Sequence, residues 1–269
     1  MHKVITICNK DYFKYAKLFI ETRHRVKAKF YMYGPDLTDQ QRELLHKNKI
    51  VYIPIPQELF DTKMQTLKFL FLQDSIDNAN NEDLITFVDA DTFFLKDWNP
   101  SVSRWKFDIG ITTRNDMMDI GCLRAYANGG VIFIRNTDKS FDFMAIALDT
   151  IEAGCNIDLP EYGEIWKTLE DPKRPEHKRH FRTNLRCWTD QVFLSALVYH
   201  RLRNSPGTRI NDTLSYSYDK YLVWLFNCNH YNRLETNIST KPDKNIYIKH
   251  LKQSGRQKLT GKNENLLGA

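Results

Sequence analysis

The sequence predicts an α/β protein in which helices flank a mixed, mostly parallel β-sheet. Strand-like and helix-like segments alternate through the first half of the chain, which is the pattern of parallel strands joined by helical crossovers. The length of 269 residues suits one large domain or two small ones, and the 42% share of apolar residues is that of a globular protein. In sheets of this kind ligands bind beyond the carboxyl ends of the strands, so we look for site residues there.

The alternation is clearest before residue 92. β-Branched and aromatic runs predict strands, and stretches in which apolar residues recur among charged ones predict helices. The expected elements are a strand at Lys3–Cys8, a helix at Asp11–His24, a strand at Ala28–Gly34, a helix opened by Thr38, a strand at Ile50–Ile55, a helix at Lys63–Ser75 and a strand at Asp83–Asp91.

The second half of the chain is less regular, and it contains no repeat or interdomain linker. Pro172–Arg182 combines prolines and basic residues with few apolar ones and predicts an exposed loop, and residues 261–269 predict a flexible tail. The expected elements are strands at Phe107–Thr113 and Gly129–Ile134, helices at Lys139–Glu152 and Thr189–His200, and a strand at Asn245–Leu251.

The charge balance narrows the class of ligand. The chain has 39 Lys and Arg residues against 33 Asp and Glu residues, which gives a formal net charge of +6. This excess favours an anionic partner such as a phosphorylated small molecule, and it is too small to require nucleic acid. The composition excludes collagen-like, coiled-coil and wholly disordered chains.

Cysteine spacing and apolar runs indicate the compartment. None of the five cysteines forms a C-x-x-C pair, so we predict neither a zinc knuckle nor a disulfide framework, and we expect reduced thiols. No apolar run reaches the roughly 18 to 20 residues of a membrane span, and no signal-peptide core opens the chain. We therefore expect a soluble, cytoplasmic protein without a transmembrane segment.

The sharpest chemical signal is the segment FVDADTFFL, in which Asp89 and Asp91 follow an apolar strand. Residues i and i+2 of an extended chain face the same way, so both carboxylates are expected on one side. Two carboxylates at the carboxyl end of a strand can bind Mg²⁺ or Mn²⁺ and leave coordination positions for phosphate oxygens. The alternative is a surface turn with two solvated acids.

Two enzyme classes place a D-x-D motif after an apolar strand. Haloacid-dehalogenase-type phosphatases use D-x-D-x-[TV] on the first strand of the domain and add an acidic pair downstream. Here Phe93 stands at the fifth position, the motif lies on about the fourth strand, and the sequence contains no Asp-Asp dipeptide. These differences argue against a phosphatase of that class.

The second class is the nucleotide-sugar glycosyltransferases, and here the resemblance extends from the first strand to residue 258. The chain resembles glycosyltransferase family 8 and related enzymes of the GT-A fold, which is Rossmann-like. In this family the first strand and the turn after it hold the nucleoside. The matching segment is TICNKDY, and its candidates are Thr6, Cys8, Asn9, Asp11 and Tyr12.

Tyr12 could stack on the base in this resemblance. The alternative for the same segment is an ordinary strand-to-helix turn in which Asp11 caps the helix. The resemblance also assigns Asp89 and Ala90 to the donor, and it places Lys68, on the helix before D-x-D, at the donor diphosphate or sugar. Lys68 could instead extend to solvent.

Two further segments match in order. YANGGVIFIRN places Asn128 near the sugar hydroxyls and lets Gly129 and Gly130 bring the backbone close to the ligand. CWTDQVF places Asp190 at the donor sugar with Gln191 beside it, and these two are the candidate catalytic residues. The alternatives are a glycine turn before an edge strand and a helix cap.

The last match is IKHLKQSGRQK. Family members end with a histidine that completes the metal shell, then a glycine and a lysine on the diphosphate, and His250, Gly255 and Lys258 match with a longer spacer. Proline and tryptophan usually follow that lysine in the family, whereas this chain continues with Leu259 and Thr260. The departure leaves Lys252 or Arg256 as alternative phosphate contacts.

The resemblance implies transfer of a sugar from a UDP-sugar, with Mn²⁺ or Mg²⁺ held by Asp89, Asp91 and His250. It implies one domain at residues 1–260, with a nucleotide-binding half at about 1–115 and an acceptor half at about 116–260. It favours retention of configuration, with Asp190 beneath the anomeric carbon. The acceptor, whether glycan, protein or lipid, stays open.

Three rival functions remain. A sugar-phosphate nucleotidylyltransferase shares the sheet, but its glycine-rich signature is missing from HKVITICNKDY. A nucleic-acid-binding protein would fit the charge and the 13% aromatic content, yet the aromatic residues fall mainly in apolar runs and no nucleic-acid motif occurs. A relative that keeps the motifs without turnover is the third.

Overall fold

The computed structural model describes residues 2–63, 66–76, 83–114, 126–153, 165, 189–202, 207–210, 213–218, 220–235, 241 and 243–251. Within these residues a nine-stranded sheet has the order β3-β2-β1-β4-β7-β6-β10-β9-β8. The pairings make β7 and β9 run against the other seven strands. The prediction of a mixed, mostly parallel sheet is confirmed.

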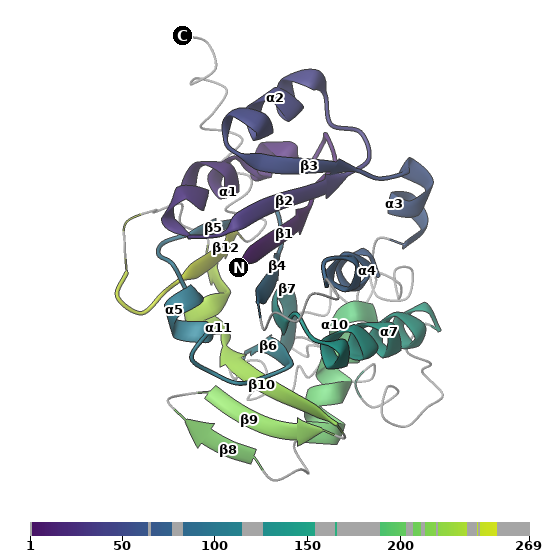
Figure 1. The fold of residues 1–269 in the computed structure, drawn as a ribbon, viewed down its shortest axis with the longest axis vertical. Coiled ribbons are helices and arrows are strands. Elements are labelled where there is room, and N and C mark those ends of the chain that lie inside the picture. Colours follow the sequence, from purple (N-terminus) through teal and green to yellow (C-terminus); the bar gives the residue numbers. More distant parts are fainter. Residues whose placement is uncertain are drawn as a thin grey trace, which may run out of the picture.

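In Figure 1 the strands of the large sheet run from β3 at the top to β8 at the lower edge. They are β1 (Lys3–Ile7), β2 (Lys29–Gly34), β3 (Ile50–Pro54), β4 (Leu84–Val88), β6 (Ile109–Thr113), β7 (Ala127–Arg135), β8 (Gly207–Ile210), β9 (Thr213–Tyr218) and β10 (Tyr221–Asn227). All five residues of β4 are buried, which agrees with a strand covered on both faces.

Helices cover both faces of this sheet. They are α1 (Lys17–Thr22), α2 (Asp39–Lys47), α3 (Gln57–Lys63), α4 (Leu67–Asp74), α5 (Asn99–Val102), α7 (Asp138–Glu152), α10 (Thr189–Ala196) and α11 (Cys228–Tyr231). One apolar core joins α4, α7 and α10 to alternate strand residues such as Ile85 and Phe87, on the right in Figure 1. A second core joins α1, α2, α5 and α11 to the opposite face.

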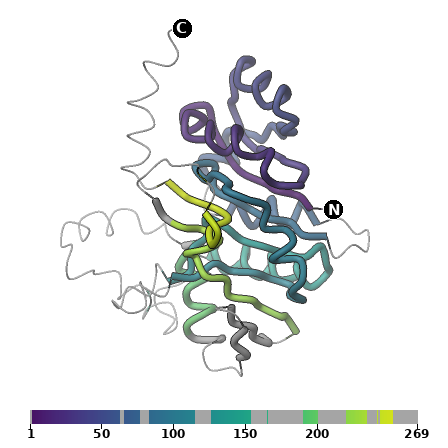
Figure 2. Tube along the Cα trace, turned by 90° about the vertical axis from the view of Figure 1, so that its left-hand side faces the viewer, coloured from purple at the N-terminus to yellow at the C-terminus, as the bar shows by residue number. Residues whose placement is uncertain are grey.

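A second sheet of three strands lies beside the large one. It has the order β11-β12-β5, with β11 at Arg233–Glu235, β12 at Ile248–Leu251 and β5 at Thr92–Phe94. β12 runs antiparallel to β5, and Figure 2 shows this yellow strand lying against the blue segment from the first half of the chain. Residues after D-x-D therefore meet residues from the C-terminal part of the chain.

Local sequence signals explain several element boundaries. Thr38 opens α2 as predicted, because its side chain accepts from the Gln41 amide while Gln41 bonds back to Thr38. The helix expected at Asp11–His24 is instead a 3₁₀ turn, a short α-helix and a second 3₁₀ turn. The helix expected at Lys63–Ser75 begins later, at Leu67, and the structure adds α3, which we did not predict.

The sequence pattern also missed strands. β5 has three residues and follows the D-x-D turn at once, so its phenylalanines look like a continuation of the preceding strand. β10 lies inside the sheet between β6 and β9 and is mainly buried. Its apolar run was not predicted because the second half of the chain lacks the regular alternation. A strand at Asn245–Leu251 was predicted, and the observed strand is its last four residues.

No helix among the described residues is long and apolar enough to cross a membrane. Of the cysteines in these residues, Cys8 and Cys228 are buried and carry no disulfide. Cys122, Cys155 and Cys187 lie outside the described residues, as do Pro172–Arg182 and the tail at 261–269.

The buried His2 predicts loss of stability in acid. Burial lowers the pKa of His2 to about 3, whereas the unfolded chain has about 6.5. Below pH 6.5 the unfolded state therefore binds a proton that the folded state does not, and the free energy of unfolding falls as the pH drops toward 3. At pH 5 the expected loss is about 2 kcal/mol.

The measurement is urea unfolding of the wild type and His2→Gln at several values between pH 5 and 7. Gln can keep the side-chain hydrogen bond that His2 Nε2 makes with Thr86 at 3.0 Å, but it cannot titrate. The variant should lose less stability than the wild type over this range. Parallel curves for the two proteins would show that His2 does not carry the effect.

Candidate functional site

The D-x-D motif forms a tight turn at the end of β4. The strand ends at Val88, and the Asp89 amide donates to the Gly130 carbonyl at 2.9 Å. The amide and hydroxyl of Thr92 both donate to the Asp89 carbonyl, at 3.0 and 2.8 Å. The expectation that the strand continues to Asp91 is therefore wrong, because Thr92 closes a turn at this point.

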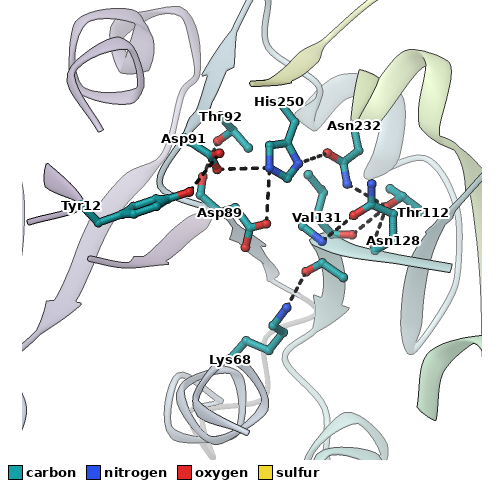
Figure 3. A network of polar contacts seen from close by, with 12 residues as sticks. Tyr12, Lys68, Asp89, Asp91, Thr92, Thr112, Asn128, Val131, Asn232 and His250 are labelled. Atoms are coloured by element: carbon teal, nitrogen blue, oxygen red, sulfur yellow. Dashed lines mark hydrogen bonds and ion pairs between the residues drawn. The ribbon is translucent and has the colours of Figure 1, made fainter. Parts of the chain in front are cut away.

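The turn brings both carboxylates to His250 of β12 (Figure 3). His250 Nε2 lies 3.1 Å from Asp91 Oδ1 and 3.6 Å from Asp89 Oδ2. One ligand atom from each of the three residues lies within 4.8 Å of the others. The Leu251 amide donates to the Asp91 carbonyl at 3.2 Å, which fixes β12 beside the turn.

The residues of the first strand and its turn lie next to this group. The Tyr12 hydroxyl donates to Asp91 Oδ2 at 3.1 Å, so its phenol oxygen faces the cluster (Figure 3). Asn9 accepts from the Tyr12 amide at 2.9 Å and stabilises the turn, whereas Asp11 is exposed. The alternative in which Asp11 caps this turn is not what the structure shows. Stacking of Tyr12 on a base remains a prediction.

Thr6 and Cys8 are buried at the same end of β1. The Thr6 hydroxyl oxygen is fully buried and has no hydrogen-bond partner among the described residues. The Cys8 thiol donates to the Asn9 carbonyl at 3.4 Å, and burial, followed by the charges of Asp91 and Asp36, raises its pKa. Cys8 is thus a buried, neutral thiol near Asp91.

Burial and charge oppose each other at the two aspartates. The Asp91 side chain is 1% exposed and that of Asp89 is 34% exposed. Burial raises the pKa of the Asp89 carboxyl, and Lys68 and His250 oppose that effect without reversing it. The ionised pair is therefore costly in this place, and a bound cation would offset the cost.

Lys68 of α4 reaches the other side of the site. Its ammonium lies 2.5 Å from Asp190 Oδ2 and donates to the Gly129 carbonyl at 3.2 Å. Burial lowers the pKa of Lys68, but the charges of Asp190 and Asp89 raise it by more, so the net direction is upward. The alternative of a lysine extended to solvent is wrong, because its side chain is only 13% exposed.

The start of β7 lies between these two groups. Asn128 is buried and its Oδ1 accepts from the Gly130 amide at 2.9 Å. A Cβ at Gly129 would lie 3.0 Å from both Asp190 Oδ2 and Lys68 Nζ, and one at Gly130 would lie 2.8 Å from Asp89 Oδ2. A side chain at either position would press on these groups and make them shift. β7 is central in the sheet rather than an edge strand.

Other predicted residues are placed less fully. Ala90 is buried inside the D-x-D turn, and the partly exposed Gln191 follows Asp190 in the first turn of α10. Lys252, Gly255, Arg256 and Lys258 lie outside the described residues, so their assignment to the diphosphate remains a prediction.

Sequence reasoning missed two buried residues behind His250. Asn232 Oδ1 lies 3.2 Å from His250 Nδ1, and Asn232 Nδ2 donates to Thr112 Oγ1 at 3.3 Å. A single asparagine outside any motif gives no signal in a sequence. Only the pairing of β12 with β11, which begins directly after Asn232, brings it to the site.

The three clustered side chains fit a divalent cation. They supply two carboxylates and one imidazole. Mn²⁺ accepts this mixed set of oxygen and nitrogen ligands, whereas Mg²⁺ prefers oxygen ligands alone. Their ligand atoms already converge, and Gly130 keeps free the space that a Cβ would fill next to Asp89 and His250. The observed geometry therefore agrees with the metal site expected from the sequence.

Comparison with solved structures identifies the architecture. An active-site mutant of LgtC has a TM-score of 0.54 at 12% identity, with 98% of this chain and 95% of that chain covered. The galactosyltransferase LgtC in complex with donor and acceptor sugar analogues gives 0.51, with the same identity and coverage. Mouse xyloside xylosyltransferase 1 gives 0.50 at 10% identity, covering 93% of this chain and 96% of that chain. The chain has the GT-A fold.

The GT-A fold accounts for the position of the site at the carboxyl end of β4, where the D-x-D turn meets β7 and β12. No family model and no curated protein matches the sequence. The fold is therefore shown by structure alone, at an identity too low to carry an activity with it.

The ion pair between Lys68 and Asp190 predicts a large coupling energy. Lys68→Met should lower the free energy of unfolding by about 3 kcal/mol, because it leaves the Asp190 carboxylate buried without its partner. Adding Asp190→Leu to Lys68→Met should recover most of the lost free energy of unfolding, because no buried charge is then left unpaired. The measurement is a double-mutant cycle in urea.

The control for this cycle is Lys220→Met. Lys220 pairs with Asp142 at 2.6 Å, but the two side chains are 54% and 49% exposed, so this change should cost less than about 1 kcal/mol. Equal costs for the buried and exposed pairs would contradict the prediction.

Gly130 predicts a steric effect on cation binding. In Gly130→Ala the new Cβ would lie 2.8 Å from Asp89 Oδ2 and 2.9 Å from His250 Nδ1, so both side chains must move. The affinity for Mn²⁺, measured by electron paramagnetic resonance of the free ion, should fall at least about tenfold.

Gly129→Ala is the matched control for Gly130→Ala. Its Cβ would press on Lys68 and Asp190 instead, so the Mn²⁺ affinity should stay close to that of the wild type. Similar losses in both variants would indicate a general distortion of β7.

Proposed function

We propose that the protein is a metal-dependent glycosyltransferase that moves a sugar from a nucleotide-diphosphate sugar to an acceptor hydroxyl. The observation that supports this most directly is the meeting of Asp89, Asp91 and His250 at the carboxyl end of β4 in a GT-A fold. The Lys68–Asp190 pair stands beside this group, on the other side of Gly129 and Gly130.

The charges match such a donor. With a cation held by Asp89, Asp91 and His250, the site and Lys68 would present positive charge to a diphosphate. The buried Asp190 carboxylate faces the same region as Gly129. The LgtC structure named above holds donor and acceptor sugar analogues. We assign the donor to the UDP-sugars, with Thr6, Cys8, Asn9, Asp11 and Tyr12 around the nucleoside.

The chemistry requires stabilisation of a leaving group. As the bond from the anomeric carbon to the diphosphate breaks, negative charge grows on the leaving oxygen and the sugar becomes oxocarbenium-like. A divalent cation bound here supplies Lewis-acid stabilisation of that negative charge. Lys68 adds a fixed positive charge that is already oriented by Asp190 and the Gly129 carbonyl.

Asp190 is the carboxylate that we place beneath the anomeric carbon. Its contact with Lys68 fixes its position before the donor binds, so its negative charge can stabilise the developing positive charge of the sugar. Gln191 on the same helix turn can position donor or acceptor hydroxyls. This arrangement suits transfer with retention, in which the acceptor oxygen bonds to the anomeric carbon on the face that the diphosphate leaves, and the departing diphosphate accepts the proton of the acceptor hydroxyl.

We assign Mn²⁺ rather than Mg²⁺ to the site because one of the three ligands is an imidazole. Phosphate contacts from Lys252 or Lys258, with Gly255 allowing close approach, complete the proposed donor site. The acceptor is left as a glycan, protein or lipid hydroxyl, since acceptor segments vary widely within one fold. A soluble, cytoplasmic location also remains a prediction.

Nucleotide binding tests this proposal. Thermal shift measurements with UDP, GDP, CDP and ADP, each with and without Mn²⁺, should show a metal-dependent rise in melting temperature for UDP. A ligand at 100 times its Kd stabilises the folded state by about 2.7 kcal/mol. If UDP gives this metal-dependent rise, hydrolysis and transfer assays with individual UDP-sugars follow.

Asp91→Asn is the diagnostic variant, because it removes one carboxylate of the cluster while keeping the size of the side chain. The Mn²⁺-dependent shift should disappear in Asp91→Asn and persist in Asp142→Asn, a surface control in α7. A shift that survives in Asp91→Asn would place the cation elsewhere. No shift with any nucleotide would favour a relative without turnover.

A further inference from the structure

A chain of buried polar contacts runs from His250 into the large sheet (Figure 3). His250 Nδ1 meets Asn232 Oδ1 at 3.2 Å, and Asn232 Nδ2 meets Thr112 Oγ1 at 3.3 Å. The Thr112 hydroxyl lies 2.9 Å from the carbonyl of Asn128 and 3.1 Å from that of Val131. We call these contacts, from His250 through Asn232 to Thr112, the Asn232 relay.

The Asn232 relay is isolated from solvent. Asn232 and Thr112 are both 0% exposed, and the His250 side chain is 10% exposed. The backbone amide of Asn232 donates to the Cys228 carbonyl at 2.9 Å, which ties the residue to the end of α11. Water cannot replace either side chain easily, so the donors and acceptors of the relay have to match one another.

The inner end of the relay fixes the direction of every hydrogen bond in it. Backbone carbonyls only accept, so the Thr112 hydroxyl donates to Asn128 or Val131. Its oxygen then accepts from the Asn232 amide, which leaves Asn232 Oδ1 toward the histidine. That oxygen accepts, so His250 Nδ1 carries a proton.

The reverse orientation is less favourable. If the Asn232 amide were flipped, its oxygen would face Thr112 and accept the hydrogen bond of the Thr112 hydroxyl. Neither the Asn128 nor the Val131 carbonyl would then receive that hydrogen bond. The flipped amide would also require a lone pair on His250 Nδ1. A ring with a proton on Nε2 would then point that proton at Asp91 and occupy the place of a cation.

We propose that Asn232 is a positioning residue that holds the proton of His250 on Nδ1 and so presents the Nε2 lone pair to the cation between Asp89 and Asp91. This inference rests on the proposed metal-dependent function. Fixing the second nitrogen of a metal-binding histidine by a hydrogen bond sets both the tautomer and the ring orientation. Asn232 and Thr112 thereby join the site without touching the donor.

The first test measures binding of Mn²⁺ alone, by electron paramagnetic resonance, in the absence of nucleotide. Asn232→Leu removes both hydrogen bonds at similar volume and should weaken Mn²⁺ binding about 10- to 100-fold. Asn232→Asp keeps an acceptor for His250 Nδ1–H, and it should bind Mn²⁺ within a few-fold of the wild type. A purely structural role would not separate these two variants.

Thr112→Val and Thr86→Val form a matched pair of controls. Both threonines are 0% exposed and lie on neighbouring regions of the same sheet, but Thr86 bonds His2 and Trp98 rather than the Asn232 relay. Thr112→Val should weaken Mn²⁺ binding, and Thr86→Val should leave it unchanged. Equal effects of the two changes would overturn the proposal.

The second test needs no metal. In ¹⁵N-histidine-labelled wild-type protein, His250 should show a solvent-protected Nδ1–H signal, which should be absent in Asn232→Leu and present in Asn232→Asp. A wild-type His250 that carries no proton on Nδ1 would overturn the inference even if Mn²⁺ binds. Failure of the wild type to bind Mn²⁺ would instead overturn the proposed function, so the two failures can be told apart.

Discussion

Two carboxylates and an imidazole meet at the end of β4, where Asp91 is almost wholly withdrawn from water. Their ligand atoms lie within 4.8 Å of one another. Two negative carboxylates this close repel strongly where water is scarce, so neighbouring groups have to hold the carboxylates in place. Tyr12 donates to one carboxylate and Thr92 closes the turn below the other. Gly130 supplies a surface without a Cβ. Most of the local structure can be understood as support for this unfavourable arrangement.

The sheet topology collects these groups from distant parts of the chain. β1 and β4 run in parallel and end at the same edge of the sheet. β7 runs against β4, so it is the amino end of β7, with Asn128 and the two glycines, that reaches this edge. β12 reaches it through a separate sheet that pairs with β5. The reversal of one strand is thus what places glycines, rather than larger side chains, beside Asp89.

The sequence was informative where chemistry and strand pattern coincide. The alternation of strand and helix patterns was enough to predict the sheet, and an apolar strand followed by D-x-D was enough to predict the acidic pair. The chain is not extended through Asp91, however, because β4 ends at Val88. The contact of Lys68 with Asp190 could not be predicted, because the residues lie on helices that only the packed core brings together. Asn232 was missed because its residue type gives no signal. Its role comes from its burial and from its contacts with His250 and Thr112. The three-residue β5 is stabilised by its partner β12 and has no local signal of its own.

Lys68, Asp190 and Gly129 also constrain how the sequence can change over evolution. Any side chain at position 129 would crowd both charged groups at 3.0 Å, and losing either charge would leave the other buried without its partner. Changes at the three positions are therefore expected to be correlated. Relatives that replace the lysine with a shorter residue should tolerate a larger residue in place of the glycine and should also have lost the acid. Substitutions at Lys68 on α4, Gly129 on β7 and Asp190 on α10 should therefore occur together among relatives.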